Sequence, residues 1–159
     1  MTSENPLVRL LIQHEGQVKQ QGQHVPYDDK TGARFDQGDT LVGKMTVGIG
    51  RNLTDVGISD DEAMLLLTND VEKVRCQLNT ALPWWTTLNE VRQAVLISMA
   101  FNMGTAGLLK FKVTLGHIQR GEYVQGAAAM LESAWAKQVG PRARMLSTMM
   151  ATGLWPQDL

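Results

Sequence analysis

The sequence has too little cysteine and too few long apolar runs for a disulfide-built or membrane-spanning protein. Its one cysteine, Cys76, cannot form an intrachain disulfide, so nothing in the chain requires an oxidising compartment. No apolar segment approaches the length of a membrane span. The first residues do not form a signal peptide, because Glu4 and Arg9 interrupt them and the apolar run 10–12 is short. We therefore expect a cytoplasmic product without stable membrane insertion, which needs separate release if its target lies outside the membrane.

Motifs for metals and cofactors are also missing. The three histidines, at positions 14, 24 and 117, have no ligand spacing with a cysteine or with one another. There is no glycine-rich phosphate loop followed by Lys-Ser/Thr, and no Gly-x-Ser-x-Gly elbow. The pair Gly48 and Gly50 lacks the rest of a dinucleotide fingerprint. The sequence therefore predicts no metal site and no cofactor.

The charge is nearly balanced overall but unevenly distributed. The formal net charge is −1, with 8 Lys+Arg against 12 Asp+Glu in residues 1–80 and 7 against 4 in residues 81–159. An acidic first half suits a carboxylate-lined site, and a basic second half suits an anionic polymer. Ordinary scatter over two solvated surfaces is the alternative interpretation.

The first third of the chain predicts a short helix followed by a small sheet. Leucines at helical spacing and a proline in the first turn favour a helix over Pro6–Glu15, which Gly16 can end. Residues 17–57 then contain seven glycines and the alternating run Met45-x-Val47-x-Ile49. This pattern is typical of turns and short antiparallel strands. We expect an extra hairpin between Gly32 and Gly43.

The rest of the chain predicts helices. Ser59-x-x-Glu62 is a capping box that opens an apolar stripe ending near Leu78, and Thr87-x-x-Glu90 is a second box. The second box opens a helix that reaches about Met103 and is apolar on almost all sides, as expected of the buried centre of a helical domain. Further short helices are expected near residues 105–119, 122–136 and 141–152.

These elements predict a single domain with an α+β fold. We expect a small antiparallel sheet lobe over 16–57 and a connecting helix over 58–80. A mainly helical lobe over 81–159 should pack with the N-terminal helix. An active-site cleft is expected between the two lobes.

Carboxylates are the residues most able to carry chemistry. Glu15 ends an apolar helix just before the sheet, and an apolar wall there would favour the protonated form that a general acid needs. A surface glutamate at a helix end is the alternative. A second carboxylate must come from the sheet lobe, where Asp28, Asp29, Asp36 and Asp39 are open candidates that are also suited to turns. Thr46 lies in a strand pattern, and its hydroxyl could orient a water beside a carboxylate.

The order of short motifs along the chain carries a family resemblance. The first half contains His14-Glu15-Gly16, Tyr27-Asp28-Asp29 and the segment 43–53, Gly-Lys-Met-Thr-Val-Gly-Ile-Gly-Arg-Asn-Leu. The second half adds segments 57–63, 69–71, 91–94, 101–104, 141–144 and 152–155, together with Trp135. In this order, over nearly its whole length, the chain resembles the phage-type lysozymes, the endolysins of glycoside hydrolase family twenty-four.

The resemblance implies a set of site residues. The catalytic glutamate of the family matches Glu15, its strand threonine matches Thr46, and its aspartate, two positions after a tyrosine, matches Asp29. Substrate contacts are assigned to Asn102, Arg142 and Gln138, with Arg142 also matching an arginine near the catalytic glutamate of the family.

The spacing departs from the family at two points. Thirteen residues separate Glu15 from Asp29 and sixteen separate Asp29 from Thr46. Insertions around 20–26 and 33–42 would explain both gaps, and they keep Asp28, Asp36 and Asp39 open as alternatives to Asp29. In addition, Arg51 stands where some members carry a histidine.

The implied activity is hydrolysis of the β-1,4 bond between N-acetylmuramic acid and N-acetylglucosamine in peptidoglycan, for host cell lysis. The implied partner is the peptidoglycan glycan strand, with no nucleic acid. The protein is expected to be a monomer that reaches the wall from the host cytoplasm through a separate holin-like membrane protein. Two alternatives from other classes are membrane disruption by the basic segment 134–155 and a catalytically inactive wall-binding module.

Overall fold

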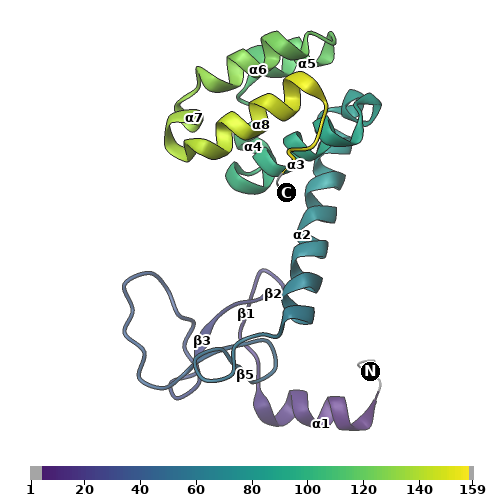
Figure 1. Cartoon of the computed structure of the whole chain (residues 1–159). Helices are drawn as coiled ribbons and strands as arrows, with labels where there is room; N and C mark the ends of the chain where they lie inside the picture. Colours follow the sequence, from purple (N-terminus) through teal and green to yellow (C-terminus); the bar gives the residue numbers. More distant parts are fainter. Residues whose placement is uncertain (1–4, 158–159) are drawn as a thin grey trace. The chain divides into compact units, whose positions relative to one another are not determined.

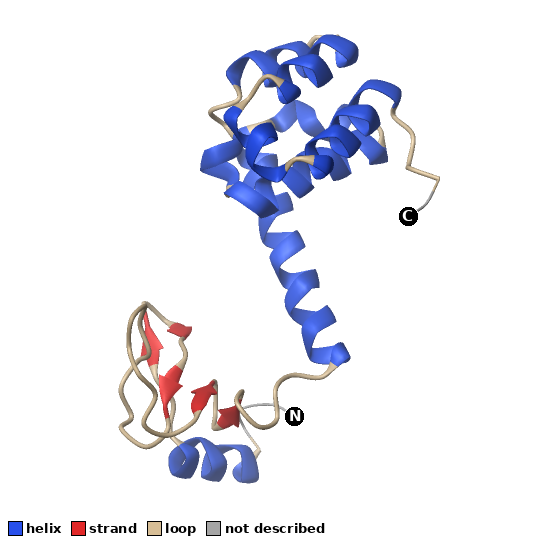
Figure 2. Ribbon diagram, turned by 60° about the vertical axis from the view of Figure 1, so that its left-hand side comes forward, coloured by secondary structure: helices blue, strands red, loops and turns tan. Residues whose placement is uncertain are grey.

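The computed structural model describes residues 5–157, which divide between Ala63 and Met64 into two compact units. We call residues up to Ala63 the N-terminal unit and residues from Met64 the helical unit. The strands, drawn red in Figure 2, belong to the N-terminal unit, and the other unit is built from helices. This mixed composition confirms the α+β fold class. The expected lobe boundaries and the packing of the N-terminal helix stay predictions.

The N-terminal unit begins with the helix that the sequence predicts. Helix α1 spans Pro6–Glu15, and the Asn5 side chain caps it by accepting the Leu7 N–H at 2.9 Å. The chain then leaves the helix at Gly16, which has a φ of 70°. The strands that follow are short: β1 Lys19–Gln20, β2 Gln23–His24, β3 Tyr27–Asp28, β4 Met45–Val47 and β5 Arg51–Asn52.

The strands form two separate antiparallel sheets. Strands β1 and β2 make a two-stranded hairpin, and β3, β4 and β5 make a three-stranded sheet in that order. Within the larger sheet Thr46 pairs with Tyr27 on one side and with Asn52 on the other. The central strand of this sheet therefore carries Thr46, and the turn 48–50 connects it to β5.

The prediction of a hairpin between Gly32 and Gly43 is wrong. Residues 30–43, which we call the insert loop, form turns and irregular structure, with one isolated bridge between Tyr27 and Arg34. The extra hairpin lies earlier, at β1 and β2. The reason is that the Asp28 side chain accepts backbone N–H groups at both ends of the insert loop, which a strand ladder would otherwise use.

Helix α2, Asp60–Ala81, runs across the division between the units. The capping box at its start is confirmed, since Ser59 Oγ accepts the Glu62 N–H at 3.3 Å and Glu62 Oε2 accepts the Ser59 N–H at 2.8 Å. Of the expected apolar stripe, Leu78 is buried but Leu66 and Leu67 are exposed. The stripe is thus a core face only toward the C-terminal end of the helix.

The second capping box is wrong. Residues Pro83–Thr87 form a short 3-10 helix, η1, and the next helix, α3, begins at Glu90 and ends at Met103. Asn89 is its cap, because the Asn89 side chain accepts the Arg92 N–H at 3.0 Å. The Thr87 hydroxyl instead donates to the Trp84 carbonyl at 2.7 Å. Asparagine and threonine both cap helices well, and Pro83 sets the short turn that decides between them.

The helices after α3 are short, and the last of them has the expected bounds. They are α4 Thr105–Leu108, α5 Lys112–Gln119, α6 Tyr123–Leu131, α7 Ala134–Val139 and α8 Pro141–Thr152. Helix α6 packs against both α5 and α8, and α8 also contacts α3 and α7 (Figure 1). The expected spans 105–119 and 122–136 are each divided in two, by the turn at 109–111 and by Ser133, which caps α7 through its side chain.

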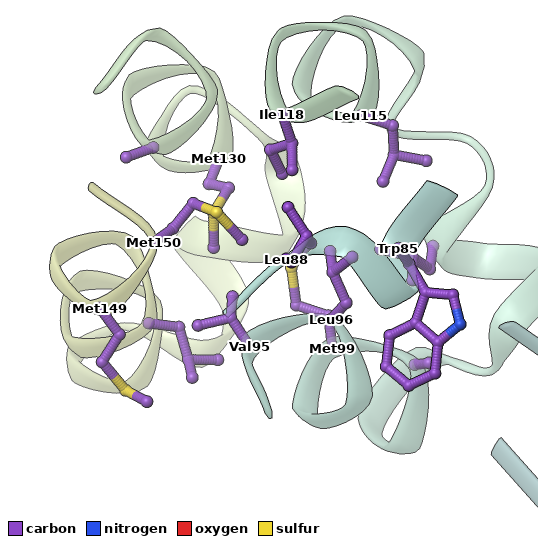
Figure 3. Packing of buried hydrophobic residues seen from close by; sticks show 14 of the residues in the cluster. Trp85, Leu88, Val95, Leu96, Met99, Leu115, Ile118, Met130, Met149 and Met150 are labelled. Atoms are coloured by element: carbon purple, nitrogen blue, oxygen red, sulfur yellow. The ribbon is translucent and has the colours of Figure 1, made fainter. Parts of the chain in front are cut away.

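The core of the helical unit forms around α3. Val95, Leu96 and Met99 of this helix are completely buried, which confirms that α3 is the centre of the unit. Met130 and Met150 reach the same cluster from α6 and α8 (Figure 3). Flexible methionine side chains fill the spaces between the branched ones.

The apolar residues of segment 134–155 belong largely to this core. Trp135, Leu146 and Met149 are each less than one tenth exposed, and they pack with the buried cluster. This packing favours a structural role over a membrane-active one for the segment. Among the described residues no helix combines the length and apolar character needed to cross a bilayer.

Candidate active site

Glu15 lies at the C-terminal end of α1, directly against Gly50. A β-carbon built on Gly50 would stand 2.9 Å from Glu15 Oε2 and 3.1 Å from Glu15 Cβ. Gly50 ends the turn between β4 and β5, so the carboxyl group meets the sheet at this turn. The Glu15 side chain is exposed in the structure, which agrees with the alternative of a surface glutamate at a helix end and not with a desolvated carboxyl group.

Thr46 occupies the centre of the three-stranded sheet and is 3% exposed. Its hydroxyl donates to the Lys44 carbonyl oxygen at 3.4 Å, a long hydrogen bond. A hydroxyl that is held this loosely keeps its capacity to accept a hydrogen bond from a water or a substrate group. Thr46 is thus a buried polar residue on the central strand of the sheet.

Asp29 follows β3 and shares a hydrogen-bond acceptor, the Lys44 carbonyl oxygen, with Thr46. Its N–H donates to the Lys44 carbonyl at 3.0 Å, and its Oδ1 accepts the Lys44 N–H at 2.7 Å. The Lys44 carbonyl therefore accepts from both Asp29 and Thr46. The structure brings these two predicted site residues together through Lys44, with the Asp29 side chain exposed.

Asp28 has a different environment from Asp29. It is 5% exposed, and its two oxygens accept backbone N–H groups from the insert loop. The bonds from Gly43, Val42, Thr31 and Lys30 hold the pKa of the Asp28 carboxyl below its ordinary value, with those from Gly43 and Val42 contributing most. A buried carboxylate held by the backbone on both oxygens is poorly placed to meet a substrate.

The other two aspartate candidates lie in a turn of the insert loop. Asp39 Oδ2 accepts the Asp36 N–H at 2.7 Å, and Asp36 forms an ion pair with Arg34 at 2.7 Å. Both side chains are exposed. These contacts are those of turn-forming residues, which leaves Asp29 as the aspartate whose surroundings best suit catalysis.

Arg51, the residue that departs from the family pattern, makes an ion pair with Glu62 in the first turn of α2. It also donates to the Gly57 carbonyl at 3.4 Å. The Ser59 N–H lowers the pKa of Glu62 most, and the charge of Arg51 adds to this. Arg51 therefore fastens β5 to the start of α2.

The helical unit holds the three predicted substrate-binding residues in separate settings. Asn102 Oδ1 accepts the indole N–H of Trp135 at 2.9 Å. Arg142 donates to the Ser98 hydroxyl at 2.9 Å and to the Ser98 carbonyl at 3.3 Å. Gln138 is exposed on α7. Their substrate contacts stay predictions.

Two open pockets of the helical unit adjoin these residues. One, of about 340 Å³, is lined by Arg75, Ser98, Phe101 and Arg142 among others. The other, of about 460 Å³, has Phe111 and Trp135 in its wall, with Lys110, Lys112 and Glu132 also lining it. The two rings meet edge to face, with centroids 6.1 Å apart. Each pocket combines apolar surface with charged groups, as polar polymer sites do.

The described residues contain no group of three His, Cys, Asp or Glu side chains that could hold a metal ion. The predicted catalytic residues of the N-terminal unit offer two carboxyl groups and one hydroxyl group. Glu15 can exchange a proton, Asp29 can carry negative charge, and Thr46 can orient a water.

A small antiparallel sheet with a helix-end carboxyl group, in a chain that continues as an all-helical unit, defines a lysozyme-like protein. The model of the phage lysozyme family matches residues 28–150, which is more than half of the chain. The chain belongs to the phage lysozyme family, and the resemblance read from its motifs is confirmed. Glu15 precedes the matched residues, so the match does not test its role.

Two relatives show how far the likeness extends. The chain is 29% identical over 110 residues to the pre-baseplate central spike protein Gp5 of Enterobacteria phage T4, covering 66% of this chain and 19% of that protein. It is 29% identical over 69 residues to the probable T4-type lysozyme 1 of Dictyostelium discoideum, covering 43% of this chain and 41% of that one. The chain thus matches less than half the length of either relative.

Three groups of the site have roles that the sequence did not indicate. The close approach of Gly50 to Glu15 and the contacts of Gly43 depend on the folded loops. Ser98 was seen only as part of an apolar helix, although it accepts from Arg142. Of these three residues, only Gly50 had a signal in the sequence, as part of the glycine pair 48 and 50. The pair indicates a turn, but it does not indicate the contact with Glu15.

Proposed function

We propose that this chain is a lysozyme-type peptidoglycan hydrolase that cleaves the β-1,4 bond between N-acetylmuramic acid and N-acetylglucosamine. The observation that carries the proposal is the placement of the Glu15 carboxyl group against Gly50, at the turn that follows the Thr46 strand. Family membership supports the same reaction class. A carboxyl group at a sheet edge, with a second carboxylate nearby in the sequence, is the minimal equipment for glycoside hydrolysis.

In the proposed mechanism Glu15 protonates the leaving glycosidic oxygen. Asp29 stabilises positive charge on the sugar or guides the attacking water, and Thr46 holds that water. The position of Lys44 supports this division of roles, because its carbonyl oxygen accepts from the Asp29 N–H and from the Thr46 hydroxyl, and its N–H donates to the Asp29 carboxylate. Asn102, Arg142 and Gln138 are proposed to contact the glycan strand.

The first experiment compares Glu15→Gln with wild-type protein on purified peptidoglycan, followed by turbidity. Loss of a general acid should lower turnover by about 10² or more while the unfolding temperature stays unchanged. Glu72→Gln, which changes an exposed glutamate of α2, is the matched control and should keep wild-type turnover. Wild-type turnover in Glu15→Gln would remove Glu15 from the mechanism.

The second experiment identifies the bond and the reaction. Mass spectrometry of digested peptidoglycan should show muramic acid at the new reducing ends. Glucosamine at those ends would contradict the proposed bond. Anhydro ends would show a lytic transglycosylase instead of a hydrolase, and intact peptidoglycan would leave a wall-binding module.

We also propose that the protein acts as a monomer in host cell lysis and reaches the wall through a separate holin-like membrane protein. If so, bacteria that express the chain should keep their turbidity until the inner membrane is permeabilised, and should then lyse. Cells that express Glu15→Gln should not lyse after the same treatment. Lysis without permeabilisation would contradict the dependence on separate release. Light scattering of the purified protein tests the monomer.

A further inference from the structure

Asp28 closes the insert loop by binding both of its ends. Its Oδ1 accepts the N–H groups of Lys30 at 2.9 Å and of Thr31 at 3.1 Å, where the loop begins. Its Oδ2 accepts those of Val42 at 2.6 Å and of Gly43 at 3.0 Å, where the loop ends. Hydrogen bonds to an ionised carboxylate are stronger than neutral ones, and this carboxylate is almost completely buried. One side chain therefore fixes where the loop returns to the sheet.

The return of the loop sets the position of Asp29. The N–H of Gly43 binds Asp28, and the N–H of the next residue, Lys44, binds Asp29 Oδ1 at 2.7 Å. Because a single residue with two soft torsions joins these N–H groups, holding one restricts the other. Two neighbouring carboxylates thus accept two consecutive N–H groups. The buried Asp28 accepts that of Gly43, and the exposed Asp29 accepts that of Lys44.

Gly43 fits between the two carboxylates because it has no side chain. A β-carbon there would stand 2.7 Å from Lys30 Cβ and 3.0 Å from Asp28 Oδ1, and closer still to Asp29 Oδ1. Its φ lies outside the left-handed region, so backbone conformation does not require a glycine. The requirement is for space, and the atom most affected is the Asp29 oxygen that Lys44 holds.

We propose that Asp28 and Gly43 are positioning residues that hold the Asp29 carboxylate for the reaction. The inference rests on the proposed function, in which Asp29 is the second catalytic carboxylate. Asp28 does not touch the substrate, since its oxygens are bound by the backbone. It acts through the Gly43–Lys44 peptide, and its negative charge stays in place because the backbone N–H groups stabilise it.

The test uses Asp28→Asn, with Asp39→Asn as its matched control. Both changes convert a carboxylate of the same region to an amide, but Asp39 binds only within a turn of the insert loop. Misplacing a catalytic group by about 1 Å can cost about 10²-fold in rate. We expect Asp28→Asn to lower kcat about 10- to 100-fold with KM changed less than about twofold, and Asp39→Asn to change neither.

A double-mutant cycle shows whether Asp28 acts through Asp29. In an Asp29→Ala background, adding Asp28→Asn should cost less than about twofold, because the group it positions is gone. If the two losses instead multiply in full, or if Asp28→Asn keeps wild-type kcat, the proposal is overturned.

Gly43→Ala tests the same idea without removing a charge. Its control is Gly116→Ala in α5, another glycine outside the left-handed region, where the nearest atom is the Arg120 side chain at 3.4 Å. We expect Gly43→Ala to lower kcat and Gly116→Ala to leave kcat unchanged. Should Asp28→Asn fail to fold, this pair carries the kinetic test, and full activity in Gly43→Ala overturns the proposal.

Hydrogen exchange separates a failure of this inference from a failure of the proposed function. The Lys44 N–H should exchange faster in Asp28→Asn than in the wild type, while exchange in α3 is unchanged. If the wild type releases no sugar ends, the proposed function fails and the positioning of Asp29 is still decided by exchange. If the wild type is active and Lys44 exchange does not change, only the positioning role fails.

Discussion

The Glu15 side chain lies so close to the α-carbon of Gly50 that any side chain at Gly50 would have to displace it. An added β-carbon would stand 2.9 Å from Glu15 Oε2, and Gly50 also has a φ of 71°. Two independent requirements therefore favour glycine at position 50: the positive φ of the turn and the space that the Glu15 side chain occupies. The contact fixes the end of α1 against the β4–β5 turn.

This relationship predicts different effects for two glycines of the same turn. Gly48 has a φ of 66°, but a β-carbon there would meet no atom within 4 Å. Gly48→Ala and Gly50→Ala should each lose about 1–2 kcal/mol of stability from left-handed backbone strain. Only Gly50→Ala should displace Glu15, and we expect turnover on peptidoglycan to fall a further ~10-fold or more.

The comparison of the two variants cancels the backbone strain that they share. Thermal unfolding measures the stability of each variant, and the turbidity assay measures turnover well below the unfolding transition. Equal turnover in Gly48→Ala and Gly50→Ala would show that the contact with Glu15 has no part in the reaction.

Asn102 offers a test between a structural and a substrate-binding role. Its Oδ1 accepts the indole N–H of Trp135, which is 7% exposed. Asn102→Ala would leave this donor without its partner and should cost about 1–3 kcal/mol of unfolding free energy. Asn102→Asp keeps an acceptor and should cost less.

Urea unfolding and KM measured on the same variants separate the two roles. If Asn102→Ala leaves the stability unchanged and raises KM, then the residue is mainly a substrate contact. If it lowers stability with KM unchanged, then its predicted contact with the glycan strand is wrong.

The helix-forming parts of the sequence were predictable because their signals are local. Helix α1 has the predicted bounds, and the Ser59–Glu62 capping box forms as expected. The apolar pattern of α3 likewise identified the buried centre of the helical unit. Each of these features depends on residues within a few positions of one another, so a single sequence is enough to indicate them.

The insert loop was not predictable, because its structure depends on a contact across the loop. Turn-forming glycines and aspartates suggested a hairpin, but Asp28 binds N–H groups 14 and 15 residues away and holds the segment as a loop. For the same reason the sequence could not separate Asp28 from Asp29. One is buried and the other exposed, although they are adjacent and chemically identical.

Arg92 joins the start of α3 to the end of α8, and its loss should destabilise the helical unit. Its guanidinium donates to the carbonyls of Met150 at 2.9 Å and Ala151 at 3.2 Å, and its Cζ lies 3.7 Å from the centre of the Tyr123 ring. These carbonyls belong to the last turn of α8, which a cation stabilises. Arg92→Ala should cost about 2–3 kcal/mol.

Urea unfolding of Arg92→Ala, Arg92→Lys and Arg144→Ala measures this contribution. Lysine keeps the charge but not the planar fork, so it should recover only part of the loss. Arg144 is an exposed arginine of α8, and its removal should stay within about 0.5 kcal/mol. An equal loss of unfolding free energy in Arg92→Ala and Arg144→Ala would show that the contacts of Arg92 with α8 and Tyr123 do not stabilise the unit.

Glu122 predicts a stability that depends on pH. It lies at the start of α6 and accepts from Arg120 at 2.8 and 3.1 Å, and it contacts His117 Nδ1 at 2.6 Å. The hydrogen bonds from Arg120 and then from His117 lower its pKa from 4.5 to about 2. The pKa of Glu122 is lower in the folded protein than in the unfolded chain, so a proton binds Glu122 more readily in the unfolded chain as the pH falls. The stabilisation by Glu122 is therefore full above about pH 5 and is lost as the pH falls toward 2.

The urea midpoint of wild type should exceed that of Glu122→Gln at about pH 5, and the gap should narrow between pH 4.5 and 2. Glu132→Gln is the matched control, because Glu132 lies at the other end of α6, away from Arg120 and His117. Its gap from wild type should not narrow in this window. A gap for Glu122→Gln that is as large at pH 2 as at pH 5 would mean that Arg120 and His117 do not lower the pKa of Glu122 in the folded protein.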